Sequence, residues 1–367
     1  MAKNISEKTL QDLEFNTVLE QVANYCISDL GKEQVLAIRP IVEPENLHKE
    51  LQLVNEYLSS FISENKIPNH AFENISQEIF TLNIENSFLE ATAFLKIATL
   101  SETANELLKF FKKFESYFPT LYQISQEVEF TTIVIDAIKK IVTPFGEVAN
   151  NASPVLKQIR KDISKIRGKI GESFKKDLSR YSTLGYLDDI RETVVDNHRV
   201  LAVLAMYRRK VTGNFLGASK TGSIVYIAPQ ATLNYSRELQ DLAYEEQQEV
   251  TRVLKELAAA IRPFTPLLQE YLAYLTHLDV IASKASYAKE INALLPKITT
   301  EKKIQLKNAF HPILWVNNTK KNLTTIPQSI YLDSKQQIIV ISGPNAGGKS
   351  ITLKTIGLLQ VMLQSGL

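Results

Sequence analysis

The sequence of 367 residues is 44% hydrophobic and has a formal net charge of +2, so it is long and apolar enough for a globular protein of two or three domains. It contains no apolar run of about 18 residues and no apolar signal core near the first residues, so we expect neither a membrane span nor secretion. The single cysteine, Cys26, excludes an internal disulfide, and we expect it to be a buried small hydrophobe in a reducing, cytoplasmic environment.

Positive charge is concentrated in one segment. Residues 154–222 contain 15 Lys or Arg against 7 Asp or Glu, a surplus of +8, which leaves −6 for the rest of the chain. A basic segment within a near-neutral chain is typical of a surface that meets a polyanion. A solvated helix face is the alternative explanation.

The first 150 residues have a helical pattern. Apolar residues such as Leu47, Leu51 and Val54 recur three or four positions apart, and prolines such as Pro68 and Pro119 interrupt the pattern. We therefore expect several helices that form a helical core over residues 1–150.

A long helix is predicted after a turn-rich link that ends near Ser153. Asn151 to Ser153 offer a helix cap, and Pro154 suits the first helical position. At 1.5 Å per residue, a helix from Pro154 to Tyr181 would form an arm of about 40 Å, and we assign residues 151–183 to it. Its apolar seam consists of Val155, Ile159, Ile163, Ile166, Ile170, Phe174 and Leu178.

At Gly185 the pattern changes from helical to extended. We expect strands at Ile190–Val195, Arg199–Met206 and Ser223–Ala228, the first two joined by a hairpin turn. The loop from Gly213 to Gly222 is rich in glycine and hydrogen-bond donors, as a surface close to a phosphate backbone needs, although ordinary turn glycines explain it as well. This β-rich segment spans residues 184–232.

After Pro229 the chain returns to helix, and we assign residues 233–295 to returning helices. Two long helices that flank a small β unit imply an antiparallel pair with the β unit at its tip. We expect the two helices to pair by charge, because the returning helix carries Glu238, Asp241, Glu245, Glu246 and Glu249.

Residues 296–367 have an α/β pattern, with strands expected at Ile304–Leu306, Ile313–Val316 and Ile338–Ile341, the last of them a buried parallel strand. Gly343 to Ser350 then fits G-x-x-x-x-G-K-[ST] at every fixed position, ahead of a helical pattern. This is a P-loop, and a plain glycine turn is the alternative.

In a P-loop the glycines turn backbone N–H groups toward phosphate oxygens, Lys349 reaches the β- and γ-phosphates, and the Ser350 hydroxyl holds Mg²⁺. We therefore expect ATP and Mg²⁺ as cofactors. Because the sequence ends at Leu367, before an acidic Walker B strand, we expect an incomplete nucleotide domain. The expected cofactor-binding residues are Gly343, Pro344, Asn345, Ala346, Gly347, Gly348, Lys349, Ser350 and Ile351.

Several segments carry a family resemblance: Gly343-Pro344-Asn345 with the paired Gly347-Gly348, Thr352–Leu359, Gln364–Leu367, Gly222–Pro229 and Ala282–Ala288. Together with the helical core and the arms with a β tip, they resemble the MutS superfamily of DNA-binding ATPases over essentially the whole chain. Within it, the chain is most similar to the second bacterial branch, which lacks the mismatch-recognition domain.

The resemblance implies a mainly α fold with a small β clamp, in which a helical core and long antiparallel lever helices precede the beginning of an α/β, ABC-type P-loop ATPase domain. By resemblance, residues 151–183 and 233–295 are the lever helices, and residues 184–232 form a DNA clamp. Ile326 is the residue expected to pack on adenine. The DNA-binding candidates are Arg191, Arg199, Arg208, Arg209, Lys210, Ser219 and Lys220.

By resemblance, the function is that of an ATP-dependent clamp on branched or structured DNA, in the control of recombination or repair, with a homodimer formed through complete ATPase domains. The ribosome is a further partner implied by the branch. Walker B, the signature segment and the branch's C-terminal nuclease domain are absent from the sequence. A chromosome-structure-type ATPase and a non-hydrolysing DNA or ribosome scaffold are the alternatives.

Two short motifs depart from the family pattern. Phe310-His311-Pro312 stands where family members often have Arg-His-Pro, so any role of that arginine is absent, and we expect His311 to be a structural turn residue. Phe145-Gly146-Glu147 matches the spelling of the mismatch-reading Phe-x-Glu motif but precedes the lever. We expect the Phe145 ring to fold onto the core.

Overall fold

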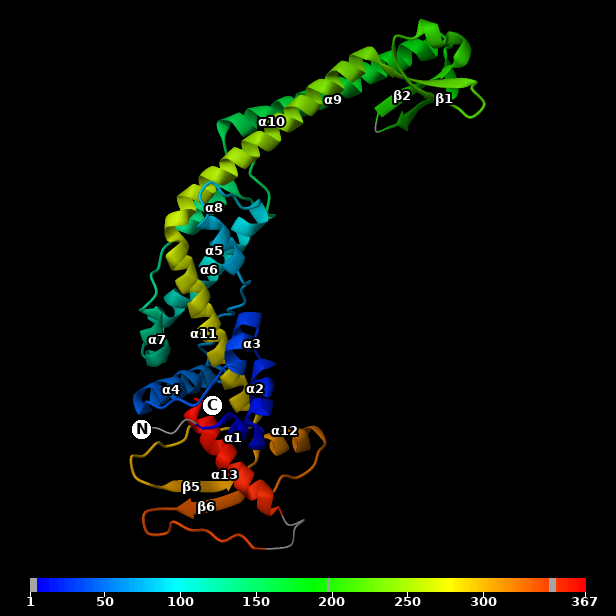
Figure 1. The fold of residues 1–367 in the computed structure, drawn as a ribbon. Helices are drawn as coiled ribbons and strands as arrows, with labels where there is room; N and C mark the ends of the chain where they lie inside the picture. The colour runs from blue at the N-terminus through cyan, green and yellow to red at the C-terminus, as the bar shows by residue number, and fades with distance from the viewer. Residues whose placement is uncertain (1–4, 197, 343–347) are drawn as a thin grey trace. The chain divides into compact units, whose positions relative to one another are not determined.

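The computed structural model describes residues 5–196, 198–342 and 348–367. The expected fold class is confirmed, because helices dominate and the sheets of the described residues are small and antiparallel (Figure 1). None of the described helices is long and apolar enough to cross a membrane. The chain forms two compact units, a core unit of Met1–Asn83, Lys96–Asp136 and Arg262–Leu367 and an arm unit of Ile84–Leu95 and Ala137–Ile261.

The core unit is built mainly of helices, and its two strands form a two-stranded antiparallel sheet. Helices α6 (Ala91–Lys113) and α8 (Ile133–Ile141) belong partly to each unit. The other elements of the core unit are α1 (Glu7–Asp12), α2 (Phe15–Ala23), α3 (Asp29–Leu36), α4 (Pro44–Ser60), α5 (Ser76–Leu82), α7 (Pro119–Ser125), η2 (Arg262–Phe264), α11 (Thr265–Glu290), β5 (Ile304–Ala309), α12 (Pro312–Lys320), β6 (Gln328–Leu332) and α13 (Lys349–Gln364).

One hydrophobic cluster joins both ends of the chain. Phe15 and Val18 of α2 pack in it with Tyr287 of α11 and with Leu358 and Met362 of α13, all of them buried. Figure 1 shows the same arrangement, with the first helices beside α13. The helix that follows the P-loop is therefore part of the core unit's packing, and Cys26 is buried at the edge of this cluster, as expected.

A buried carboxylate fixes the start of α3. Asp279 of α11 accepts hydrogen bonds from the backbone N–H groups of Ile27 (2.9 Å) and Ser28 (2.8 Å) and from the Ser28 hydroxyl (2.6 Å). Burial alone would raise the pKa of Asp279, but these hydrogen bonds and the His70 ring, whose Nε2 lies 3.7 Å from the carboxylate, outweigh it and lower the pKa. The ionised carboxylate thus satisfies the free N–H groups ahead of α3.

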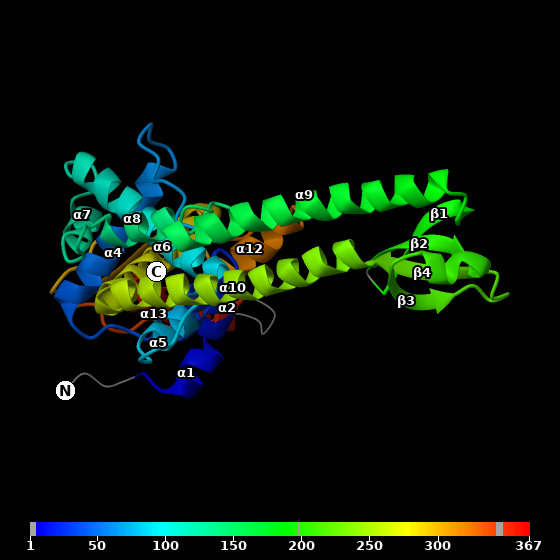
Figure 2. The ribbon, with the colours of Figure 1, turned by 90° about the horizontal axis from the view of Figure 1, so that it is seen from above.

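The arm unit consists of two long helices and a small sheet. The first, α9 (Pro154–Thr183), begins at Pro154 as predicted, with the Ser153 hydroxyl accepting from Leu156 N–H at 2.9 Å. The second, α10 (Gln230–Ile261), runs alongside α9, and Figure 2 shows the sheet at the far end of the pair. Its remaining elements are β1 (Leu187–Val195), β2 (His198–Leu204), η1 (Ala205–Lys210), β3 (Gly213–Ala218) and β4 (Ile224–Pro229).

The sheet has the strand order β1-β2-β4-β3, and every neighbouring pair is antiparallel. Leu201 and Val203 pack on Phe174 and Tyr181 of α9, whereas Val200 packs on Leu233 of α10, so both faces of the sheet are covered. Both faces are covered because successive side chains of β2 point to opposite faces of the sheet, one toward α9 and the next toward α10.

Two expectations for the arm unit were wrong. Residues 213–218, expected within a loop, form β3, because β4 offers a second free edge that pairs with them. Phe145 is 88% exposed and does not fold onto the core. It lies at the tip of a tight turn closed by Val142 and Val148, where Gly146 has a φ of +75° and the ring projects away from the turn's hydrogen bonds.

Two strands expected near the end of the chain were also wrong. Ile313–Val316 lies in α12, because Pro312 at the first helical position starts a helix and the buried Ile313 and Val316 then fall on one face. Ile338–Ser342 is not hydrogen-bonded as a strand, and Ile338 and Val340 are 80% and 86% exposed. A buried parallel strand needs neighbouring strands, and no other described strand pairs with it.

Candidate nucleotide site and nucleic-acid interface

The nucleotide site can be followed from Gly348 onward, because Gly343, Pro344, Asn345, Ala346 and Gly347 lie outside the described residues. Gly348 has a φ of +82° at the N-cap of α13, and a Cβ at this position would meet nothing within 4 Å. Lys349, the exposed Ser350 and Ile351 form the first turn of the helix.

This geometry fits an anion. The first backbone N–H groups of a helix lack intrahelical partners and carry a partial positive charge, so the N-terminus of α13 favours a phosphate. Lys349 and Ser350 supply an ammonium group and a hydroxyl at the same end. A nucleotide with Mg²⁺ would bring the phosphates and the cation that such groups hold.

Helix α13 contacts other helices of the core unit along its length. Near its start, the Lys354 ammonium lies 2.9 Å from a carboxylate oxygen of Glu14, a residue with a φ of +61° at the corner between α1 and α2. One turn later, the Leu13 side chain packs against Gly357 so closely that a Cβ there would overlap it. The P-loop helix therefore rests directly on the α1–α2 corner.

The end of α13 meets a buried charged group. The Lys284 ammonium of α11 lies 3.3 Å from a Glu50 carboxylate oxygen of α4 and 3.5 Å from the Ser365 carbonyl oxygen. Burial lowers the pKa of Lys284 in spite of Glu50, and burial alone would raise the pKa of Glu50, but His277 and Lys284 lower it to about 2. Three helices thus converge on one ion pair.

Two further predicted residues lie near the end of the chain. His311 precedes α12 and is buried, and neither ring nitrogen has a hydrogen-bond partner among the described residues; burial lowers its pKa. It is thus the extended N-cap residue of α12 rather than the turn residue that we expected. Ile326, the predicted adenine contact, is 80% exposed in the segment before β6, so its side chain is accessible.

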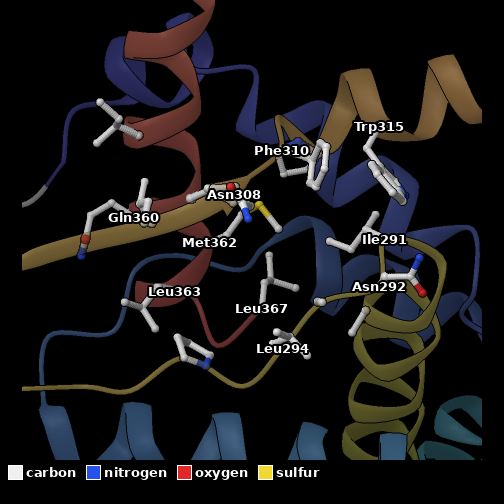
Figure 3. A pocket seen from close by; sticks show the side chains of 18 of the residues that line it. Ile291, Asn292, Leu294, Asn308, Phe310, Trp315, Gln360, Met362, Leu363 and Leu367 are labelled. Atoms are coloured by element: carbon white, nitrogen blue, oxygen red, sulfur yellow. The ribbon is translucent and has the colours of Figure 1, made fainter. Parts of the chain in front are cut away.

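The most enclosed pocket described, of about 380 Å³, is not the phosphate site (Figure 3). It lies between the end of α11, β5 and the later turns of α13, and the Phe310 and Trp315 rings pack at one side with centroids 4.7 Å apart. None of its lining residues comes from the first turn of α13. An apolar pocket of this kind does not suit a triphosphate.

In the arm unit, three predicted DNA contacts occur together on η1. Arg208, Arg209 and Lys210 are exposed, and the Arg208 guanidinium lies 4.2 Å from the Phe215 ring centroid. The Lys210 ammonium lies 5.6 Å from the ring centroid of Tyr207. Aromatic faces hold the cations at the surface without neutralising them, because a cation–π contact leaves the charge available to an anion.

The support beneath η1 was not predicted from the sequence. Tyr207 stacks on Tyr186 with ring centroids 4.5 Å apart, and Tyr181 lies 6.3 Å beyond Tyr186. Thr212 N–H donates to the Tyr181 hydroxyl at 3.2 Å, which joins the far end of η1 to α9. Tyrosines near a run of cations are the feature of the sequence that could have indicated this platform.

The other predicted DNA contacts differ in their surroundings. The Arg199 guanidinium lies 2.6 Å from a Glu192 carboxylate oxygen, so its charge is compensated. Arg191 is exposed but lies in β1 beside Asp188 and Asp189. These acids weaken the attraction of β1 for a polyanion.

Ser219 and Lys220 lie in the loop between β3 and β4. The Ser219 hydroxyl accepts a hydrogen bond from Ile224 N–H at 3.2 Å, which closes the loop, and Lys220 is exposed at its tip. Ala205 N–H donates to the Ser223 carbonyl at 2.9 Å, so this loop lies next to the start of η1. The structure therefore brings Lys220 close to the η1 segment.

Comparison with known proteins agrees with this architecture. The chain is 30% identical over 365 residues to endonuclease MutS2 of Alkaliphilus oremlandii, 32% over 372 residues to that of Leuconostoc mesenteroides, and 30% over 365 residues to that of Lacticaseibacillus casei. Each match covers 99% of this chain. Over nearly its whole length the chain is therefore similar to MutS2 proteins.

The match covers 45% of each of these MutS2 relatives, so the chain spans less than half of their length. No family model matches the chain. The MutS2 match extends over the helical core, the arms with the sheet, and α13, which are the segments on which the resemblance in the sequence depends.

Proposed function

We propose that the chain carries the DNA-binding clamp and the beginning of the ATP site of a MutS2-type protein. In this proposal ATP binds at the start of α13, and the sheet at the end of the arms holds the backbone of duplex or branched DNA without reading mismatches. The relatives' name, endonuclease MutS2, is consistent with a role on DNA.

The observation that carries the proposal is the cation cluster of η1. Arg208, Arg209 and Lys210 are consecutive, exposed and supported by a stack of tyrosines, and Lys220 lies in the neighbouring loop. Such a surface can bind phosphates of either strand of a duplex. Arg and Lys side chains bind phosphate oxygens whatever the base sequence, so the cluster favours contact with the backbone.

Salt dependence tests this proposal. In fluorescence anisotropy with a 30-base-pair duplex and a four-way junction, changing Arg208, Arg209 and Lys210 together to Ala should weaken binding to both DNAs by similar factors. The slope of log affinity against log salt should become shallower by about 0.9 for each phosphate that the variant no longer neutralises.

The matched control changes three exposed lysines of the core unit, Lys66, Lys320 and Lys321, to Ala, which alters the net charge equally. Its binding should remain close to that of the unaltered chain. If the η1 variant keeps the original affinity and slope, the η1 segment is a solvated surface and the proposed DNA interface is wrong.

A further inference from the structure

The outer face of α9 carries a regular row of cations. Lys157, Lys161, Lys165 and Lys169 follow one another at four-residue intervals, and Lys176 and Arg180 continue the row after steps of seven and four. Each step of four residues advances about 40° around a helix of 3.6 residues per turn and the step of seven turns back by about 20°, so the six residues form a band that spirals along the helix. We call these six residues the α9 row.

Lys161 and Lys165 lie opposite the packing seam, whereas Lys169 and Arg180 lie closer to its edge. The residues of α9 buried against other parts of the arm unit include Ile159, Ile163, Ile166 and Phe174, which fall on the other side of the helix from Lys161 and Lys165. Lys169 is half-buried with its ammonium 5.5 Å from the Tyr235 ring, Arg180 stacks on Tyr181, and the other four members of the row are exposed.

The acidic returning helix does not neutralise the row. The ion pair described between α9 and α10 is that of Arg160 with Glu246 at 2.7 Å, and Arg160 is not a member of the row. No member of the row has an ion-pair partner among the described residues. The expectation that the arms pair by charge therefore holds at one position of the described chain, and the row remains available.

The length of the row suits a double helix. Lys157 and Arg180 are 23 positions apart, which corresponds to about 35 Å along a helix. One turn of B-form DNA has about the same length, roughly 34–36 Å. Of the acidic residues of α9, Glu172 lies within the same face and Asp162 at its edge, so the row keeps a surplus of positive charge.

We propose that the α9 row is a second polyanion-binding surface, which holds the phosphodiester backbone of a double-stranded nucleic acid along the arm, separately from the η1 cluster at the tip. The proposal rests on the proposed function, because it assigns a second surface to the same arm unit. Lysines that bind phosphate as point charges suit a backbone whose sequence varies. DNA and RNA share this chemistry, and the test separates them.

The test uses the full 367-residue chain and a variant in which Lys157, Lys161, Lys165 and Lys176 are changed to Gln. Glutamine keeps the helix propensity close to that of lysine, and circular dichroism confirms that the helices are retained. Affinity is measured over a range of salt concentrations with 30-base-pair duplexes of DNA and of RNA.

The expected result is that the salt slope becomes shallower by about 3.6, which corresponds to about 0.9 for each of the four lysines. If the loss is seen with DNA alone or RNA alone, the row discriminates between the two helices. A loss of the same size with both shows that it recognises the shared backbone.

The matched control changes Lys66, Lys112, Lys320 and Lys321 of the core unit to Gln and removes the same net charge. An equal loss of slope in this control and in the α9 variant would overturn the inference, since the effect would then be one of net charge. An unaltered slope in the α9 variant would also overturn it.

The η1 variant separates the two proposals. If it loses binding while the α9 variant binds like the unaltered chain, the proposed function stands and the α9 row is a solvated face. If neither variant loses binding, the proposed function fails together with the inference that rests on it.

Discussion

At the scale of single residues, the Glu50 carboxylate connects three helices of the core unit. It lies 3.3 Å from the buried Lys284 ammonium and 3.4 Å from a His277 ring nitrogen, and Lys284 in turn contacts the end of α13. Glu50 of α4 thereby helps to fix the end of α13, although nothing in the sequence of α4 marks this residue. Replacing Glu50 should lower the stability of the protein and change how that stability depends on pH.

We expect Glu50→Gln to lower the free energy of unfolding by about 2 kcal/mol at pH 7, because hydrogen bonds to a charged group are lost and Lys284 remains buried. The folded pKa of about 2 lies below the unfolded value of about 4.3. The contribution of ionised Glu50 is therefore complete above about pH 4.3 and is lost as the pH falls toward about 2.

Urea unfolding at pH 7 and pH 3 measures this prediction, with the exposed Glu45→Gln of the same helix as the control. The difference between Glu50→Gln and the unaltered chain should shrink at pH 3, while the control stays within about 0.5 kcal/mol at both values. A difference that does not depend on pH would show that the carboxylate acts through packing.

At the scale of elements, two positions of β3 differ in how tightly they are packed against β4. A Cβ on Gly213, at the start of β3, would overlap the carbonyl oxygen and carbonyl carbon of Ala228 in β4. Gly217 of the same strand has only ordinary contact distance, 3.8 Å, to the Tyr226 ring. The pairing of β3 with β4 therefore depends on the absence of a side chain at one position.

We expect Gly213→Ala to destabilise the sheet by about 2 kcal/mol, because the backbone of β4 cannot move as easily as a side chain. Gly217→Ala should change stability by less than about 0.5 kcal/mol. Hydrogen exchange of the β3 and β4 amides, compared between the two variants, measures the effect. Equal protection in both variants would contradict the prediction.

Two glycines lie within the long helix α9, and a Cβ at Gly168 or Gly171 would meet nothing within 4 Å. Each costs helix stability without a packing benefit, so Gly168→Ala and Gly171→Ala should each stabilise the helix by about 0.8–1 kcal/mol. Chemical unfolding followed by circular dichroism at 222 nm checks this. A loss of stability would show that the helix needs a bend at these positions.

At the scale of the whole molecule, the nucleotide site can be tested by measuring ATP binding and ATP hydrolysis. Lys349 and Ser350 lie in the first turn of α13, but Ile338 and Val340 are exposed and no described strand pairs with Ile338–Ser342. We therefore expect this polypeptide to bind ATP weakly and not to hydrolyse it.

Isothermal titration with ATP and Mg²⁺ measures binding, and phosphate release measures turnover. Binding should be lost in Lys349→Ala, because the lysine compensates the charge of the β- and γ-phosphates. Release of phosphate above background that disappears in Lys349→Ala would contradict the prediction of no turnover.

The second prediction at this scale concerns mismatches. Phe145 is exposed and could contact a base, but it lies before the start of α9, whose 30 residues separate it from the sheet by about 45 Å. An aromatic ring reads a mismatch only where the DNA is held and bent around it. We therefore expect no preference for a G·T mismatch over a matched duplex.

Competition between matched and mismatched duplexes, repeated with Phe145→Ala, decides the question. Both proteins should bind the two duplexes within about a factor of two. A preference above about tenfold, roughly 1.4 kcal/mol, that vanishes in Phe145→Ala would falsify this prediction.

Local patterns in the sequence were sufficient for much of the architecture. The start of α9 at Pro154 and the hairpin that joins β1 and β2 followed from spacing and capping residues, since a helix or hairpin is defined by neighbours along the chain. The P-loop match required only its own eight residues. Six of the seven predicted DNA contacts are cations, and the sequence does not show which cations lie together or are already paired with an acidic residue.

Tertiary structure decided the features that depend on distant partners. Residues 213–218 became a strand because β4 has a free edge, while Ile338–Ser342, with a stronger strand pattern, has no described neighbour with which to pair. Phe145 is 88% exposed in its turn although the neighbouring Gly146 packs against Thr92, and Arg199 is compensated because the β1–β2 register places it near Glu192. Hydrogen bonding between strands, burial and charge pairing each depend on two segments that meet in the fold. The sequence of one segment alone therefore does not determine them.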